Sequence, residues 1–228
     1  MIVQIYTVQS PEEGIALAEL GVDHIGITPS EHGLPGEISN EYAAEIFAAI
    51  GERAVKVALT VDSDLWKIVD MVQTVRPDIL HLCGDLKLLT PEKVMELRRL
   101  LPGMKIMQAI PVMDASALQI ARDFEAVSDY FILDSYSPQI GGIGAAGFTH
   151  DWSISRAIVE QSKIPVILAG GLSPENVEDA IQQVRPWSVD SLTKTNLPLG
   201  VGKFRKDLEK VKLFVERAKR VGNLIVVR

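Results

Sequence analysis

The sequence predicts an α/β fold, a single (β/α)8 TIM barrel that spans residues 1–228. Three observations favour it: short β-branched runs alternate with helix-like segments, Gly or Pro separates most of these units, and no linker divides the chain. Such alternation predicts a parallel sheet, because parallel strands need a crossover connection. Eight units in roughly 220 residues fit a closed barrel, which is usually about 250 residues long with a lower limit near 200.

The first four units follow one another from the beginning of the chain. A strand over 2–6 precedes a helix opened by Ser10, Pro11 and two glutamates, since Ser caps a helix, Pro suits its first turn and acids favour the positive end of its dipole. Residues 28–39 are rich in Gly and Pro and predict a long loop. The other strand–helix pairs of this half are expected at 24–27 and 41–50, at 55–61 and 63–75, and at 79–82 with a helix opened at Thr90.

The back half continues the pattern, with a glycine-rich loop after the sixth strand. Its pairs are expected at 105–110 and 115–126, at 130–134 and 152–161, at 166–169 with a helix opened by Ser173-Pro174-Glu175, and at 187–190 with a last helix near 203–220. A doubly wound open sheet uses the same units. That fold normally has a glycine-rich phosphate turn directly after its first strand, and residues 7–10 contain no glycine. The closed barrel is therefore preferred.

Composition excludes several classes of partner. The chain has 23 Lys and Arg against 30 Asp and Glu, a net charge of -7, which argues against nucleic acid binding. One cysteine, Cys83, forms neither an intramolecular disulfide nor a multi-cysteine metal site, and residues 1–30 carry no signal-peptide pattern, so we expect a cytoplasmic protein. No apolar run approaches the roughly 20 residues that span a bilayer, so no membrane partner is expected.

A phosphate site is predicted at the barrel mouth, because reacting groups of such barrels lie at the carboxyl ends of the strands. Two glycines after the seventh strand permit close backbone approach, and the next helix offers amides to an anion. Hydroxyl groups and a lysine ammonium after the eighth strand can close over that anion. The candidate substrate- and phosphate-binding residues are Gly142, Gly144, Gly170, Gly171, Asp190, Ser191 and Lys194.

Several segments carry a resemblance to a known family. They are 131–136 with 141–144 and 148–152, then 167–177 and 184–190, and more loosely Pro11-Glu12 and 82–85. Together they resemble the phosphoribosylanthranilate isomerase family. This resemblance implies a barrel of the ribulose-phosphate-binding type and a cofactor-free Amadori rearrangement of a phosphoribosyl amine in tryptophan biosynthesis. It also implies that Asp134, at the end of the sixth strand, is the general acid.

Three positions depart from the family pattern. Tyr6 occupies the position of the family's catalytic cysteine, and a tyrosine with its usual pKa near 10 is a poor base at neutral pH. Gly36 replaces the arginine that holds the anthranilate carboxylate, and the adjacent Glu37 adds a negative charge. Cys83 occupies a histidine position. We expect Asp134 to protonate the ring oxygen, with Cys83 or Tyr6 handling the carbon-bound proton.

The resulting hypothesis is acid–base isomerisation of a small phosphorylated sugar-type metabolite, with little of the family's own activity. Two alternatives stay open: a genuine phosphoribosylanthranilate isomerase with a relocated base, and a non-catalytic barrel that binds a phosphorylated metabolite. Structural roles also stay open, namely a cap for Asp134, a buried apolar role for Cys83 and a tight turn for the glycines after the seventh strand. No two histidines have metal-ligand spacing, so neither metal nor cofactor is expected. The protein is expected to be a monomer or a homodimer.

Overall fold

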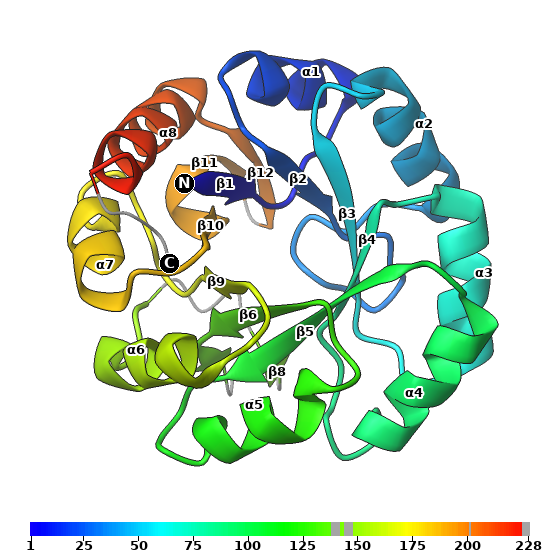
Figure 1. The fold of residues 1–228 in the computed structure, drawn as a ribbon. Coiled ribbons are helices and arrows are strands. Elements are labelled where there is room, and N and C mark those ends of the chain that lie inside the picture. Colours follow the sequence, from blue (N-terminus) through cyan, green and yellow to red (C-terminus); the bar gives the residue numbers. More distant parts are fainter. Residues whose placement is uncertain (138–141, 144–147, 201, 225–228) are drawn as a thin grey trace.

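A computed structural model describes residues 1–137, 142–143, 148–200 and 202–224. Eight parallel strands close into a barrel in the order β1-β10-β9-β6-β5-β4-β3-β2, with helices around it (Figure 1). The predicted (β/α)8 barrel is therefore confirmed. The barrel strands are β1 (Ile2–Ile5), β2 (His24–Ile27), β3 (Val55–Thr60), β4 (Ile79–Leu82), β5 (Lys105–Pro111), β6 (Tyr130–Asp134), β9 (Val166–Leu168) and β10 (Ser188–Ser191).

The helices begin where local capping groups are available. Ser10 caps the first helix as predicted, accepting a hydrogen bond from the Glu13 amide, and Asp64 and Asp151 cap two others. None of the described helices has the length and apolar character needed to cross a membrane. The helices are α1 (Pro11–Glu19), α2 (Asn40–Ile50), α3 (Leu65–Val75), α4 (Pro91–Leu100), α5 (Ala117–Glu125), α6 (Trp152–Gln161), α7 (Val177–Val184) and α8 (Leu208–Gly222).

The last helix begins later than the sequence predicted. Lys203–Lys206 forms strand β12, which pairs antiparallel with β11 (Asn196–Gly200). The side chain of Asp207 accepts a hydrogen bond from the Lys210 amide and starts α8 there. The prediction of a helix from residue 203 is wrong because this cap and the preceding hairpin outweigh the helix propensity of the basic residues.

The helix after the seventh barrel strand also begins later than predicted. The Ser173 amide donates to Oδ1 of Asn176 at 2.8 Å, and the Glu175 amide donates to the Ser173 hydroxyl at 3.2 Å. These bonds hold a turn, and α7 starts only at Val177. The amides of residues 173 and 175 thus have acceptors within their own segment and are not the anion donors that a helix opened at Ser173 would supply.

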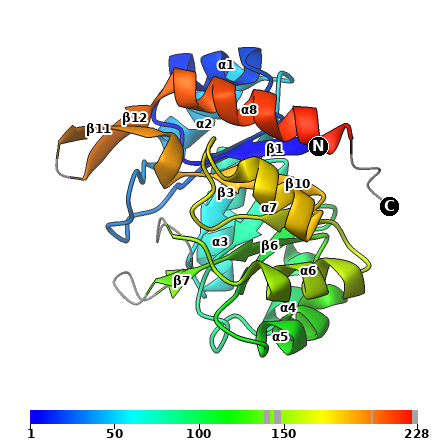
Figure 2. The ribbon, with the colours of Figure 1, turned by 90° about the vertical axis from the view of Figure 1, so that its left-hand side faces the viewer.

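A second short hairpin lies in the segment that was expected to be a loop. It consists of β7 (Tyr136–Ser137) and β8 (Gly142–Ile143), so Gly142 belongs to a strand, whereas Gly144 lies outside the described residues. Figure 2 shows β7 and the β11–β12 hairpin projecting from the same end of the barrel, opposite the N-terminus. That end is the mouth, where the parallel strands finish.

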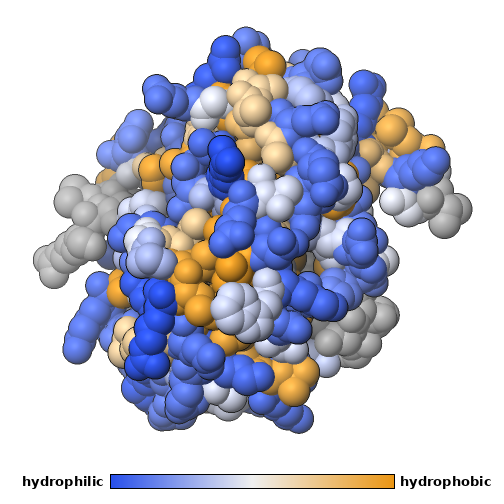
Figure 3. All heavy atoms as spheres, turned by 90° about the vertical axis from the view of Figure 1, so that its right-hand side faces the viewer, coloured by the Kyte–Doolittle hydropathy of each residue, from blue (hydrophilic) through white to orange (hydrophobic). Residues whose placement is uncertain are grey.

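Buried apolar side chains form two layers. The larger layer lies between the strands and the helices, and the smaller one fills the barrel from alternate strand positions. The outer face over α2, α3 and α4 is largely hydrophilic, with apolar atoms gathered near its middle (Figure 3). The interior layer consists of Tyr6, Val57, Ile79, Cys83, Met107, Ala109, Ile132, Ile167 and Ala169. Two predicted site residues, Tyr6 and Cys83, are thus part of the packed barrel interior.

Candidate active site

A cleft of about 1050 Å³ opens at the barrel mouth. All three predicted catalytic residues, Asp134, Cys83 and Tyr6, line it. The loop over residues 28–39 contributes four further lining residues, so this long loop forms part of the cleft wall. Strands β1, β4 and β6, which are far apart in sequence, therefore bring the predicted catalytic residues together.

Asp134 ends β6 at the mouth of the barrel. Burial raises the pKa of its carboxyl to about 7, although a hydrogen bond from the Ser135 amide, at 2.7 Å, favours the ionised form. A carboxyl group with this pKa holds a proton for a substantial fraction of the time at neutral pH. Asp134 is thus suited to donate a proton, and its role as the general acid stays a prediction.

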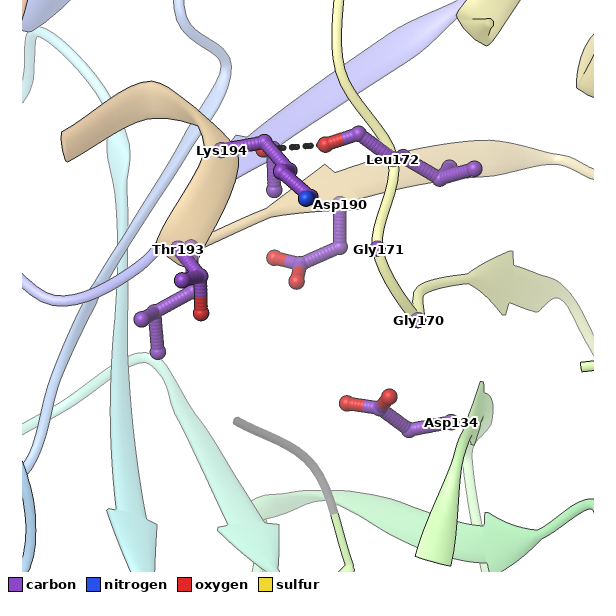
Figure 4. A pocket seen from close by; sticks show the side chains of 9 residues that line it. Asp134, Gly170, Gly171, Leu172, Asp190, Thr193 and Lys194 are labelled. Atoms are coloured by element: carbon purple, nitrogen blue, oxygen red, sulfur yellow. Dashed lines mark hydrogen bonds between the residues drawn. The ribbon is translucent and has the colours of Figure 1, made fainter. Parts of the chain in front are cut away.

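Asp190 lies on β10 and is 6% exposed. Burial and the charge of Asp134 together raise the pKa of its carboxyl to about 8, whereas Lys206 opposes the shift. Both carboxyl groups border a small pocket at the mouth (Figure 4). Because two neighbouring carboxylates are unfavourable together, the pair loses its two protons in separate steps near neutral pH.

Tyr6 occupies the position at which the family pattern has its catalytic cysteine. Its side chain is 2% exposed, and its Oη atom lies 3.0 Å from Nδ1 of His81. A Cβ atom on Gly26 would lie 2.3 Å from the Tyr6 ring, so glycine at that position is what makes room for the ring. Burial, with the charges of Asp190 and Cys83, raises the pKa of Tyr6 well above its usual value. The phenol therefore stays protonated at neutral pH and is not set up to accept a proton.

Cys83 is buried on the strand-four side of the cleft and is 6% exposed. Burial raises the pKa of its thiol well above the usual range, and the charge of Asp134 acts in the same direction. The thiol form is therefore favoured at neutral pH, which argues against Cys83 as the general base.

A buried lysine from the second hairpin supports the mouth. Lys206 is 3% exposed, and its Nζ atom donates to the backbone carbonyl of Tyr6, to that of Leu192 at 3.2 Å and to Oδ1 of Asn196 at 2.6 Å. Burial lowers the pKa of this ammonium group to about 7, although Glu13 and Asp190 oppose the shift. Sequence reasoning missed Lys206 because the residue was expected on the surface of a helix.

The small pocket contains most of the predicted phosphate-binding residues. The Ser191 hydroxyl donates to the Leu172 carbonyl at 2.7 Å, which links the loop after β9 to the last residue of β10 (Figure 4). Of the predicted residues, Gly142 does not border this pocket. The pocket is lined by Asp134, Gly170, Gly171, Leu172, Asp190, Ser191, Leu192, Thr193 and Lys194.

The two glycines after β9 are required by the backbone itself. Gly170 and Gly171 have φ values of 83° and 63°, in the left-handed region. A Cβ atom on Gly171 would lie 2.6 Å from the carbonyl carbon of Phe148, and one on Gly170 would lie 2.9 Å from Nδ1 of His150. Both residues thus hold a tight turn, in addition to bordering the pocket.

The structure leaves no space for a side chain at position 36, where the family has an arginine. Gly36 has a φ of 71°, and a Cβ atom there would lie 2.5 Å from Cζ of Phe204 on β12. The neighbouring Glu37 carboxylate accepts hydrogen bonds from three backbone amides of its own loop, at distances of 2.8, 2.9 and 3.0 Å. Glu37 therefore stabilises the loop, and Gly36 leaves no room for a guanidinium group.

No group of three metal-ligating side chains occurs among the residues that the structure describes. His32, in the long loop, has its Nε2 atom 3.1 Å from Oδ2 of Asp62. This contact links the 28–39 loop to the loop after β3.

Comparison with known proteins supports the same assignment. The model of the family described as N-(5'phosphoribosyl)anthranilate (PRA) isomerase matches residues 3–217. The N-(5'-phosphoribosyl)anthranilate isomerase of Methanocella arvoryzae is 33% identical over 217 residues, covering 95% of this chain and 97% of that protein. That of Haloferax volcanii is 36% identical over 205 residues, covering 90% and 86%.

Solved structures give the same result. Phosphoribosyl anthranilate isomerase from Thermotoga maritima is similar with a TM-score of 0.77 at 27% identity, and the match covers 96% of this chain and 100% of that chain. A phosphoribosyl anthranilate isomerase in complex with reduced 1-(o-carboxyphenylamino)-1-deoxyribulose 5-phosphate has a TM-score of 0.75 at 25% identity, with the same coverage of 96% and 100%. The resemblance found in the sequence and its assignment to an isomerase family are confirmed. The chain belongs to the N-(5'-phosphoribosyl)anthranilate isomerase family.

Proposed function

We propose that this protein catalyses an acid–base isomerisation, of the Amadori or aldose–ketose type, on a small phosphorylated sugar-type metabolite. The observation that carries the proposal is the pair of carboxyl groups, the half-buried Asp134 and the buried Asp190, beside the small pocket. Their pKa values, about 7 and about 8, give a pair that holds about one proton near neutral pH. Such a pair supplies a proton donor and a proton acceptor at once.

The reaction needs one protonation and one deprotonation. In the Amadori case, the donor protonates the ring oxygen while the C1–O bond breaks, leaving an open-chain iminium group. The acceptor then removes the proton from C2, and the resulting enolamine tautomerises to the aminoketone. Asp134 occupies the family's acid position, and Asp190, the other carboxyl of the pair, accepts the proton in its ionised form. Because the pKa of Asp190 is about 8, this ionised form is the smaller fraction near pH 7 and increases as the pH rises. The pKa values of Tyr6 and Cys83 lie higher still, so these two residues are poorer acceptors.

The charges along the cleft support a substrate with its phosphate at one end and no second anionic group. Lys194 borders the small pocket, which supports phosphate binding there. Outside the small pocket, Asp85 and Asp123 line the cleft, whereas Lys87 is the one lysine among the described lining residues of the cleft. Gly36 supplies no cation for a carboxylate such as that of anthranilate. The cleft thus favours a neutral or cationic group at the other end.

Hydrogen exchange with solvent tests this proposal directly. The purified protein is incubated in D2O with a panel of phosphorylated aldoses and phosphoribosylamines, and deuterium at C2 and ketose formation are followed by NMR. The expected result is deuterium incorporation together with product formation for at least one compound. Binding without exchange for every compound that binds would favour the non-catalytic barrel instead.

A second candidate is phosphoribosylanthranilate isomerisation itself, favoured by the family match over residues 3–217. In that case Asp190 would be the relocated base, and the anthranilate carboxylate would bind without an arginine at position 36. Including phosphoribosylanthranilate in the same panel separates the two candidates. The expectations of a cytoplasmic location and of a monomer or homodimer stay predictions, the latter open to analytical ultracentrifugation.

A further inference from the structure

His81 has a hydrogen-bonding atom that the fold leaves without a partner. The residue lies on β4, is 4% exposed and lines the cleft with Asp134 and Asp190. Its Nδ1 atom lies 3.0 Å from Oη of Tyr6. Its Nε2 atom is buried and has no hydrogen-bond partner among the described residues. An unsatisfied buried polar atom typically costs about 1–3 kcal/mol, and such atoms in a cleft often serve a ligand.

The contact with Tyr6 determines which ring nitrogen of His81 carries the proton. The Tyr6 phenol keeps its proton because burial raises its pKa, so it is able to donate to Nδ1, 3.0 Å away. With the phenol as the donor, Nδ1 is the acceptor. Burial lowers the pKa of His81 to about 3, which makes the ring neutral at physiological pH. A neutral ring that accepts at Nδ1 carries its proton at Nε2.

The position of Tyr6 is itself fixed from two sides. Its ring lies 5.6 Å from the His81 ring, at an interplanar angle of 62°, and packs over Gly26 on β2. The phenol has little freedom to turn away from Nδ1, since any Cβ on Gly26 would already overlap its ring. Tyr6, Gly26 and His81 therefore act as one packed unit across the barrel.

We propose that the Nε2–H group of His81 is a hydrogen-bond donor to an uncharged sugar oxygen of the substrate, a carbonyl or hydroxyl, with Tyr6 as the residue that positions it. This inference rests on the proposed isomerisation and adds a substrate-contacting residue to it. In an aldose–ketose step, removal of the proton from C2 builds negative charge on the C1 carbonyl oxygen, and a fixed neutral donor stabilises that charge. In an Amadori step, the electrons neutralise the iminium nitrogen, and the donor holds the C2 hydroxyl oxygen in place. Replacing the family's cysteine by Tyr6 thus removes a base and positions a donor on the neighbouring His81.

The tautomer of His81 can be measured without any substrate. Side-chain 15N NMR of the wild-type protein is expected to show His81 protonated at Nε2. His24 provides an internal contrast, because its Nδ1 atom lies 3.3 Å from Oε1 of Gln4, an acceptor, and is expected to carry the proton. Tyr6→Phe removes the hydroxyl group that contacts Nδ1, so the His81 ring should populate both tautomers and its 15N signals should shift. Tyr130→Phe, elsewhere in the barrel interior, should leave these signals unchanged. An Nδ1-protonated His81, or unchanged signals in Tyr6→Phe, would overturn the proposal.

Kinetics on a compound that the wild-type protein isomerises give the second readout. His81→Leu is expected to lower kcat about 10²–10³-fold, the usual effect of losing one such donor, with a smaller change in KM. His81→Gln retains an N–H donor and should recover part of the loss. His24→Gln is the matched control for a buried barrel histidine and should leave kcat unchanged. Equal kcat in His81→Leu and wild type contradicts the donor role while leaving the isomerisation intact. If the wild type turns over no compound, the isomerisation fails, and the tautomer measurement still decides whether Nε2 carries a proton.

Discussion

Asp134 and Asp190 border the same small pocket from two different strands, and the charge of Asp134 raises the pKa of Asp190 (Figure 4). Two carboxyl groups in such an arrangement resist simultaneous ionisation. The mouth therefore retains a proton at a pH at which isolated aspartates have lost theirs. The chemistry proposed for this barrel follows from that retained proton.

The first prediction concerns Asp134. Asp134→Asn keeps the shape of the side chain but removes the proton that it donates, so kcat should fall about 10²–10⁴-fold for any isomerised substrate. The melting temperature and the affinity for the substrate should stay near the wild-type values. Asp85→Asn, at a cleft residue outside the small pocket, is the control. Unchanged turnover with a lowered melting temperature would assign Asp134 to the scaffold.

The second prediction concerns the pH dependence of stability. The pKa of Asp190 rises to about 8 on folding, so the folded state holds this proton more tightly than the unfolded state does. The stabilising contribution of the protonated carboxyl is complete near pH 4 and is lost as the pH rises through about 8. Asp190→Asn should therefore gain melting temperature relative to wild type between pH 5 and pH 9. If the difference in melting temperature between Asp190→Asn and wild type stays constant across that range, the pKa of Asp190 is not raised in the folded state.

The third prediction tests the packing of Tyr6 against Gly26. Gly26→Ala inserts a methyl group into the Tyr6 ring, and overpacking of this kind costs about 1–3 kcal/mol in the free energy of unfolding. Combining it with Tyr6→Phe should give no relief, because the ring remains, whereas combining it with Tyr6→Cys should restore part of the loss. Urea unfolding of the single and double variants measures this coupling. Additive effects in the Tyr6→Cys pair would mean that the two side chains do not meet.

The fourth prediction is that this protein has little phosphoribosylanthranilate isomerase activity. Tyr6 cannot act as the cysteine does, and Gly36 provides no guanidinium for the anthranilate carboxylate. Expression in a tryptophan auxotroph that lacks the isomerase should give growth well below that given by a family member with the cysteine. Growth at the normal rate without tryptophan would instead identify the relocated-base enzyme.

The fifth prediction concerns the phosphate site. Lys194→Gln should weaken binding of a phosphorylated ligand about tenfold in calorimetry, because the pocket loses the ammonium group that borders it. Lys87→Gln removes a cleft lysine outside that pocket and is the matched control. Gly171→Asp is a poorer test, since a Cβ there meets the backbone of Phe148. Equal affinities for both lysine variants would place the phosphate elsewhere.

Local patterns in the sequence predict the barrel because each unit carries its own boundaries. Helix 152–161 begins after Asp151 as expected, and Ser10 caps the first helix, since both signals lie within a few residues. The start of α8 was misplaced because a run of basic residues suits a helix and an exposed hairpin equally well. The burial of Lys206 and the cap at Asp207 distinguish the two.

The site was predictable only in part. Position at a strand end singled out Asp134 and the glycines at 170 and 171, since every barrel strand delivers its last residues to the mouth. The pairing of Tyr6 with His81 and the burial that shifts their pKa values depend on contacts 75 residues apart. No spacing rule connects such positions, so no sequence pattern singles out His81.

Lys206 joins the end of the chain to its beginning, because its ammonium group donates to the carbonyl of Tyr6, 200 residues earlier. β1 also pairs with β10, so one edge of the first strand has no hydrogen-bonded neighbour until the last barrel strand has formed. During synthesis, the early units leave the ribosome well before residue 206 does, and a domain generally folds as a unit. The mouth around Tyr6 and Asp190 is therefore the last part of the molecule to become complete, and a chain stopped before the second hairpin lacks the group that closes it.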